Sequence, residues 1–394
     1  MKKVLVRGPL LSQSGYGVHA RQIFQFCESM PNWQVSTQIL PWGITPWNIS
    51  DSDEGGLYKR IMDKSGAMSA KYDLSFQIQL AHEWDPNLAT RNVGVTAGVE
   101  TNLCSSEWSN THCEKMDLVI VPSEFTKATL EKPAAGSNST PIVVLPEAYF
   151  PNLTQEATSD PLSELPTSKN ILIVGTLTSD DANADRKNLV KSISWFLSTF
   201  TEKSDVGLIV KTSRGRDTTI DREIVRKLMK QVKKSVKAQG QKPPKLYMLH
   251  GPMSRDEMRD LYKSPKLAAF ASATRGEGFG LPLLEAAVAG LPIVATNWSA
   301  YTEFLRGPSF LKVAYDLQEI PKSRVDGQIF VEKAMWAQPR GGNFTRKLKQ
   351  SVTENESIRK HAKELSVELT KSHSLETLGQ KFQQIVREHL NDLC

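Results

Sequence analysis

The feature that most constrains the fold of this chain is a regular alternation of short apolar runs with longer segments that have helical spacing. Ten such runs occur, in two series of five. A strand that is apolar along its whole length fits a parallel sheet covered by helices on both faces. Two series therefore predict two doubly wound α/β domains. The runs are residues 4–6, 74–78, 93–97, 118–121 and 142–145, and then 171–174, 206–210, 246–249, 268–271 and 292–295.

The length of 394 residues also suits two domains. Between the two series lies a segment rich in Pro, Ser, Thr and acidic residues, which is typical of a linker. We therefore predict a first domain over residues 1–150, a linker over 151–169 and a second domain over 170–350. Residues 351–394 are polar with helical apolar spacing, and we expect them to form helices that pack back across the domains.

The composition excludes a disordered chain, because apolar residues make up 39% and charged residues 23%. No window approaches the ~20 apolar residues of a membrane span, and the first apolar run is too short for a signal peptide. We therefore expect a cytoplasmic protein with reduced thiols. The cysteines show no Cys-x-x-Cys spacing, so zinc and redox motifs are not expected. They are Cys27, Cys104, Cys113 and Cys394.

A glycine-rich turn after residues 268–271 carries the most information about chemistry. Its three glycines within five residues let the backbone approach a ligand closely, and a short helix follows. Such a turn directs the N–H groups of a helix N-terminus at an anion, typically a phosphate. Glu285, in the first helical turn, can accept paired hydrogen bonds from a ribose diol, and Glu277 can face a sugar. A tight turn in which Glu285 only complements the helix dipole explains the segment equally well.

A similar order of strand, glycine loop and helix opens the chain, with Gly15 and Gly17 in the loop. Glycines at such a turn also serve packing alone. Candidate cations follow the first two strands of the second series, at the strand ends where open α/β sheets bind ligands. Lys and Arg at these places suit a pyrophosphate, although a solvated charge at a helix end is the commoner role of a single Lys. The candidates are Arg186, Lys187, Lys211 and Arg214.

These residues resemble a known family. The glycine-rich turn is similar to the Glu-x7-Glu motif of retaining glycosyltransferases with the GT-B fold, of the family 4 type. Residues 290–297, 121–125 and 145–150 resemble other stretches of that family, so the resemblance covers most of the chain. The local sequence of residues 42–47 and 94–101 resembles that of glycosyltransferases of tailed bacteriophages.

The resemblance implies two Rossmann-like domains facing a cleft, with the nucleotide-sugar donor on the C-terminal domain and the acceptor on the N-terminal domain. It implies net retention at the anomeric carbon, with neither an essential metal nor a cofactor. By position, Glu285 would take the ribose hydroxyls, Glu277 the donor sugar and Lys187 the pyrophosphate. Gly15 and Gly17 match the loop that approaches the donor phosphates.

The arginine that the family places just after a strand is absent, because Gly175 and Thr176 stand there. Arg186, Lys211 or Arg214 would have to replace it. For the acceptor side of the cleft, His82 and Glu100 compete for the place of a family histidine, and a loop histidine with a local hydrogen bond explains His82 equally well. The donor-binding set is completed by Gly278, Phe279, Gly280 and Leu281.

Asp51 and Asp53 have the Asp-x-Asp form that binds a divalent metal in the other glycosyltransferase fold. They lie in a polar loop rather than after a strand, so we interpret them as part of a solvated turn. No cluster of His, Cys and carboxylates has the spacing of a metal site, so we expect no metal.

The interpretation is a metal-independent glycosyltransferase that moves a hexosyl or pentosyl group from a nucleoside-diphosphate sugar to an acceptor hydroxyl. The net charge of +6 and the basic segment 222–245 favour hydroxymethylated phage DNA as the acceptor, although a solvated helix face explains that segment too. A glycan or a lipid-linked acceptor stays open, as does a non-catalytic protein that binds nucleotide sugars.

Overall fold

The structure, a computed structural model, describes residues 1–66, 71–132 and 139–391. Contacts within the chain group these residues into two compact units. Unit 1 comprises Met1–Ala148 together with Asp326–Ala334 and the end of the chain from His373. Unit 2 comprises Tyr149–Val325 and Met335–Ser372. Each unit therefore contains segments that are distant in the sequence.

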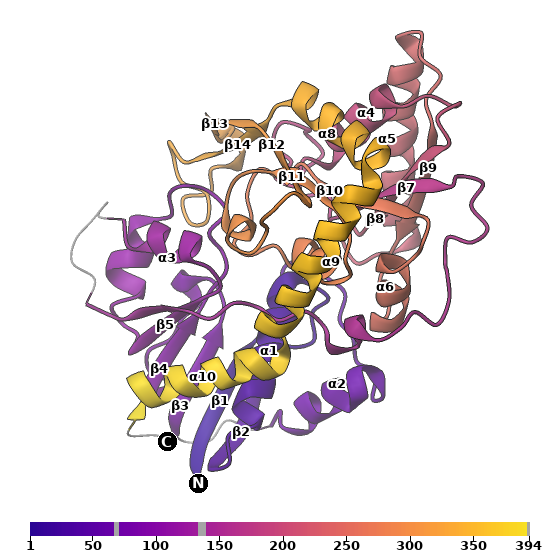
Figure 1. Ribbon diagram of the computed structural model, residues 1–394. Coiled ribbons are helices and arrows are strands. Elements are labelled where there is room, and N and C mark those ends of the chain that lie inside the picture. The colour runs from indigo at the N-terminus through magenta and orange to yellow at the C-terminus, as the bar shows by residue number, and fades with distance from the viewer. Residues whose placement is uncertain (67–70, 133–138, 392–394) are drawn as a thin grey trace. The chain divides into compact units, whose positions relative to one another are not determined.

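Unit 1 is built on a six-stranded parallel sheet with the strand order β2-β1-β3-β4-β5-β6 (Figure 1). The chain adds β2 on one side of β1 and β3 on the other, so the direction of winding reverses between β1 and β3. The carboxyl ends of these two strands form a topological switch point, where open α/β sheets bind ligands. The strands are β1 (Lys2–Gly8), β2 (Trp33–Ile39), β3 (Tyr72–Ile78), β4 (Ala89–Val95), β5 (Leu118–Val121) and β6 (Ile142–Val144).

One face of this sheet is covered by the first long helix and by the last helix of the chain. The ring of Phe382 lies 5.4 Å from that of Phe76 on β3 and 5.5 Å from that of Phe26 in the first helix. The C-terminal helix is therefore part of the core of unit 1. The helices and short helical turns of unit 1 are α1 (Gly15–Glu28), α2 (Asp53–Asp63), η1 (Ala81–Glu83), η2 (Trp108–His112), α3 (Glu124–Leu130) and α10 (Leu375–His389).

Unit 2 contains a second six-stranded parallel sheet, with the order β12-β11-β10-β7-β8-β9 (Figure 1). Counted within the unit, this is the Rossmann order 3-2-1-4-5-6 read from the other edge, and the winding reverses between β7 and β10. An antiparallel hairpin of β13 and β14 stands apart from the sheet. The strands are β7 (Lys169–Val174), β8 (Val206–Thr212), β9 (Lys245–His250), β10 (Leu267–Ser272), β11 (Ile293–Thr296), β12 (Phe310–Val313), β13 (Tyr315–Glu319) and β14 (Met335–Pro339).

The helices of unit 2 connect and cover these strands. Several begin at a side-chain cap, such as Thr218 and Ser254, whose hydroxyls accept from N–H groups of the first turn. They are η3 (Pro151–Thr154), α4 (Leu189–Thr199), α5 (Thr219–Ala238), α6 (Arg255–Tyr262), α7 (Leu281–Val288), η4 (Ala300–Glu303), η5 (Lys322–Arg324), α8 (Gly341–Thr353) and α9 (Asn355–Ser372).

The predicted fold class is confirmed: each of the ten apolar runs overlaps a parallel strand of one of two doubly wound sheets. Two sheet strands, β2 and β12, were not predicted. β2 is an edge strand whose Gln34 is exposed between buried Trp33 and Val35, so it alternates instead of forming an apolar run. β12 has only four residues, one of them the exposed Lys312.

One local expectation needs correction. Gly15 and Gly17 were expected in a loop before a helix, but α1 begins at Gly15, because the Ser14 hydroxyl caps the N–H of Gly17 at 3.1 Å. Residues 186–188 lie just before α4, since Asn188 has a left-handed backbone with φ of 54°. The interpretation of Asp51 and Asp53 as part of a solvated turn agrees with the structure, because both are exposed and residues 54–56, at the start of α2, depart from helical angles.

Cys27, Cys104 and Cys113 are free thiols, and Cys394 lies outside the described residues. Within residues 1–66, 71–132 and 139–391, no helix combines the length and the apolar character that crossing a bilayer requires.

Candidate functional site

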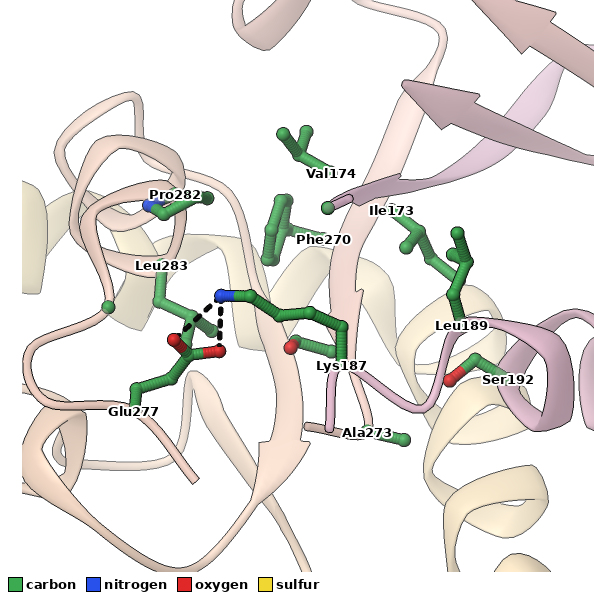
Figure 2. A pocket seen from close by; sticks show the side chains of 13 residues that line it. Ile173, Val174, Lys187, Leu189, Ser192, Phe270, Ala273, Glu277, Pro282 and Leu283 are labelled. Carbon is green, nitrogen blue, oxygen red and sulfur yellow. Dashed lines mark hydrogen bonds and ion pairs between the residues drawn. The ribbon is translucent and has the colours of Figure 1, made fainter. Parts of the chain in front are cut away.

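A small hollow opens at the switch point of unit 2, between the carboxyl ends of β7 and β10. Ile173 and Gly175 line it from β7 and its following turn, Phe270 from β10, and Leu283 from the first turn of α7. Figure 2 shows the Lys187 side chain extending across the hollow toward the Glu277 carboxylate. The hollow measures about 20 Å³, which is room for about one water molecule. Entry of a larger ligand therefore requires these side chains to move.

Two cations meet one carboxylate at this place. Lys187 Nζ donates to both carboxylate oxygens of Glu277, at 2.7 Å each, and Arg186 Nη1 donates to Oε2 at 3.1 Å. The Thr274 hydroxyl adds a fourth hydrogen bond, to Oε1 at 2.8 Å. Only 7% of Glu277 is exposed, so the carboxylate is held by partners on the protein. Three residues predicted as site residues, Glu277, Lys187 and Arg186, are thus in direct contact.

The pKa of Glu277 reflects how strongly these partners stabilise its ionised form. Burial by itself would raise the pKa of the carboxyl, but the charges of Lys187 and Arg186 and the hydrogen bonds outweigh it and lower the pKa to about 2. Glu277 is therefore ionised at neutral pH, and the three side chains together carry one positive charge.

The glycine-rich turn rests on the segment that follows β11. The N–H of Glu277 donates to the Ser299 hydroxyl at 3.0 Å. Ser299 has φ of 77° and ψ of −169°, a backbone region that glycine alone ordinarily occupies. Gly280, at φ of 108°, lies against Tyr301, where a Cβ would come within 3.2 Å of the tyrosine Cβ. The conformation of the glycine-rich turn is therefore held by two buried residues, Ser299 with its strained backbone and Tyr301.

Glu285 was expected in the first turn of the helix, but it is the fifth residue of α7 and lies just beyond that turn; it is also buried, at 7% exposure. The Tyr262 hydroxyl donates to its Oε2 at 3.1 Å, and Arg255 Nη1 lies 3.9 Å from its Oε1. Burial, and after it the charge of Glu285, raises the pKa of Tyr262, so the phenol stays a hydrogen-bond donor. This carboxylate is thus oriented by α6, the helix that precedes β10.

The other predicted donor-binding residues have different surroundings. Lys211 Nζ donates to the carbonyl of Gly251 at 2.6 Å, and Arg214 pairs with Asp180 at 2.6 Å on the surface. Neither contact involves the Glu277 cluster. Gly278, Phe279, Gly280 and Leu281 form the turn into α7, and the Phe279 ring packs against Phe304 at 5.3 Å.

The predicted site residues of unit 1 follow the strands around its own switch point. Gly15 and Gly17 start α1 after β1, and a Cβ at Gly17 would come within 2.0 Å of the Ser12 carbonyl oxygen. His82 lies in η1, after β3, and its Nδ1 is buried with no hydrogen-bond partner. Glu100 follows β4, close enough to the buried Tyr16 for its charge to help raise the pKa of that phenol, which burial raises most.

Sequence reasoning missed three residues that shape the site in unit 2. Thr274 directly precedes the glycine-rich motif, and its position beside Glu277 could have identified it. Ser299 and Tyr262 contact the two glutamates only through the fold, since they are 22 and 23 residues away in the chain. No pattern in a single sequence signals such contacts.

Three kinds of comparison with known proteins bear on this arrangement. Residues 229–309, which end beyond β11 and include the glycine-rich turn, match the family model described as "Glycosyl transferases group 1". A comparison with curated protein sequences finds no match. Many solved structures share the fold.

Sucrose-phosphate synthase from Thermosynechococcus elongatus has a TM-score of 0.65 with 12% identity, and 100% of each chain is covered. Anabaena Alr3699/HepE, solved in complex with UDP and glucose, has a TM-score of 0.61 with 13% identity, covering 98% of this chain and 100% of its own. The pneumococcal O-GlcNAc transferase GtfA, solved with UDP and GlcNAc, has a TM-score of 0.50 with 16% identity. The match covers 80% of this chain and 57% of the length of GtfA.

At these identities the solved structures establish the fold, and the family model adds a sequence signature on the unit that carries the Glu277 cluster. Two Rossmann-like parallel-sheet domains of this kind make up the GT-B fold. The chain thus has the GT-B fold, and its residues 229–309 match the model of the glycosyl transferases group 1 family.

Proposed function

We propose that this protein is a retaining glycosyltransferase that transfers a sugar from a nucleoside-diphosphate sugar to an acceptor hydroxyl. The observation that carries the proposal is the buried cluster of Lys187, Arg186 and Glu277 at the switch point of unit 2. Its excess positive charge suits a pyrophosphate, and its carboxylate suits a sugar hydroxyl. The family match over residues 229–309 supports the same chemistry.

The donor would be held at three points. The N-terminus of α7 and the Lys187 ammonium would face the phosphates, because both are positive. Glu285 would accept hydrogen bonds from the ribose hydroxyls. Since the hollow now holds about 20 Å³, the phosphate would replace at least one of the two bonds between Lys187 and Glu277.

In the reaction, the bond between the anomeric carbon and the β-phosphate oxygen breaks, and a bond from that carbon to the acceptor oxygen forms. Negative charge develops on the departing phosphate, where Lys187 and the α7 dipole would stabilise it without a metal. The acceptor would attack on the face that the phosphate leaves, and its proton would pass to the phosphate oxygen. His82 and Glu100 of unit 1 would orient the acceptor hydroxyl.

The donor site is tested by calorimetric titration of the protein with UDP, GDP and ADP. UDP is the first choice because the structural neighbours GtfA and Anabaena Alr3699/HepE were solved with it. We expect Glu285→Gln to weaken the preferred nucleotide by about 1.5–3 kcal/mol, the contribution of hydrogen bonds to a charged group. Glu364→Gln, on the exposed face of α9, is the matched control. Equal affinities of the folded Glu285→Gln variant and the control would refute the ribose assignment.

For the acceptor we propose a hydroxymethylated base in DNA. The net charge of +6 and the resemblance of residues 42–47 and 94–101 to phage glycosyltransferases support this choice. The chemistry would require the base to leave the stack and enter the site. Mass spectrometry of hydroxymethylated duplex after incubation with a panel of nucleotide sugars tests it, and transfer to a glycan but never to the duplex would refute it.

A further inference from the structure

A second cluster of charged residues, rich in lysine, lies in unit 2 at the ends of the strands away from the proposed donor site. A groove of about 520 Å³ lies where α5 ends and β9 begins, and the buried Pro243 and Pro244 are among the residues that line it. Lys245 is the first residue of β9, and Glu202 precedes β8, so the groove lies at the amino ends of these strands. The Glu277 cluster follows the carboxyl ends of strands in the same sheet. The groove and the cluster therefore lie at opposite ends of the strands.

Four lysines line the groove against a single carboxylate. The carboxylate belongs to Glu202, which lies 3.4 Å from Lys242 Nζ. The remaining charge is therefore not compensated within the lining of the groove. Burial, and then the charges of Lys237 and Lys245, lower the pKa of Lys233. The lining lysines are Lys233, Lys237, Lys242 and Lys245.

The basic segment of the sequence is thus divided by the structure into two groups. Lys233 and Lys237 on α5 turn toward the groove with Lys242 and Lys245, whereas other lysines of α5 are exposed without lining it. That second group consists of Lys227, Lys230 and Lys234. Like charges gathered around a hollow attract a chain of anions more strongly than the same charges spread over a convex helix face, since the field is focused there.

We propose that this groove binds the phosphate backbone of a nucleic acid, as a docking site separate from the donor site. A phosphodiester chain supplies evenly spaced anions that several lysines can contact together. The concave shape favours a strand over a flat anionic bilayer. The proposal rests on the proposed function only in naming the bound polymer as the acceptor, because the docking itself requires no chemistry.

The test compares two triple variants of the full chain with equal loss of charge. The groove variant combines Lys233→Gln, Lys237→Gln and Lys245→Gln, and the control combines Lys227→Gln, Lys230→Gln and Lys234→Gln. Binding of a fluorescein-labelled DNA duplex is followed by anisotropy over a series of KCl concentrations. Circular dichroism and nucleoside-diphosphate titration check that both variants fold and keep the donor site.

We expect the plot of log affinity against log salt to become shallower by about 2.7 in the groove variant, at about 0.9 for each of three lost phosphate contacts. The control should keep the wild-type slope. Equal slopes in the two variants, no binding of duplex by the wild type, or binding of anionic lipid vesicles in place of duplex would each overturn the proposal. If the groove binds DNA but no sugar is transferred to that DNA, the docking site is supported and the proposal that DNA is the acceptor is refuted.

Discussion

Replacing Lys187 with Met tests the charge cluster at the candidate site most sharply. The substitution keeps most of the side-chain stem that lines the hollow and removes the ammonium that contacts both oxygens of Glu277. Glu277 keeps Arg186 at 3.1 Å and Thr274 at 2.8 Å. Loss of one partner of a buried pair costs about 3–5 kcal/mol, and because a second cation stays we expect a loss of roughly 2–3 kcal/mol in the free energy of unfolding at pH 7.

The loss of unfolding free energy caused by Lys187→Met should be smaller at low pH than at pH 7. The pKa of Glu277 is lowered from 4.5 to about 2. A lowered pKa stabilises the folded state above the unfolded pKa, and this stabilisation of about 3 kcal/mol is lost as pH falls from 4.5 toward 2. In Lys187→Met the Glu277 carboxyl would protonate at a higher pH, so less of the variant's stability would be lost as pH falls. We expect its penalty to shrink to about 1.3 kcal/mol near pH 3, because the wild type has by then lost more than half of this stabilisation.

Urea unfolding of wild type and variant at both pH values measures this difference. Lys191→Met is the matched control, because Lys191 lies four residues after Lys187, in the first turn of α4, and its Nζ donates to the Asn183 side chain rather than to a carboxylate. A double-mutant cycle with Glu277→Gln should give a coupling of about 2 kcal/mol at pH 7. An equal penalty at both pH values, or a coupling near zero, would refute the account of the cluster.

Three further predictions concern other parts of the site. Gly17→Ala should destabilise the protein by roughly 3 kcal/mol in urea unfolding, because its Cβ would lie 2.0 Å from the Ser12 carbonyl oxygen; a normal midpoint would contradict this. Tyr262→Phe removes the hydrogen bond to Glu285 and should cost about 1.5–3 kcal/mol in unfolding free energy, and calorimetry should show weaker nucleotide binding; unchanged values for both would remove Tyr262 from the site. Sugar transfer should survive EDTA, and loss of turnover that Mg²⁺ or Mn²⁺ restores would overturn metal independence.

The sheets could be predicted from sequence because a strand buried on both faces is apolar throughout. This signal is strong for β5 and β10, which lie inside their sheets. It is weak for β2, an edge strand in which polar and apolar residues alternate. Nothing local to residues 326–334 indicates that they belong to unit 1, because that assignment depends on contacts far along the chain.

The candidate site shows the same division between local and distant information. The glycine-rich turn and its two glutamates are visible in sequence because they are close together. The contact of Glu277 with Arg186 and Lys187 spans 90 residues or more, and motif position alone suggested a shared site. Ser299 has no such signal, since its unusual backbone follows from its support of the turn.

The central claim, transfer of a sugar from a nucleotide donor, is tested most directly by following acceptor mass and nucleoside-diphosphate release together. Wild type and Lys187→Met would be incubated with a panel of nucleotide sugars and with hydroxymethylated duplex or glycan acceptors. The account predicts that one pair gives a sugar-sized mass increase with an equal release of nucleoside diphosphate, that the new bond keeps the anomeric configuration of the donor, and that Lys187→Met slows both. Absence of transfer and of nucleotide release with every donor, in a wild-type protein that binds nucleotide, would contradict it.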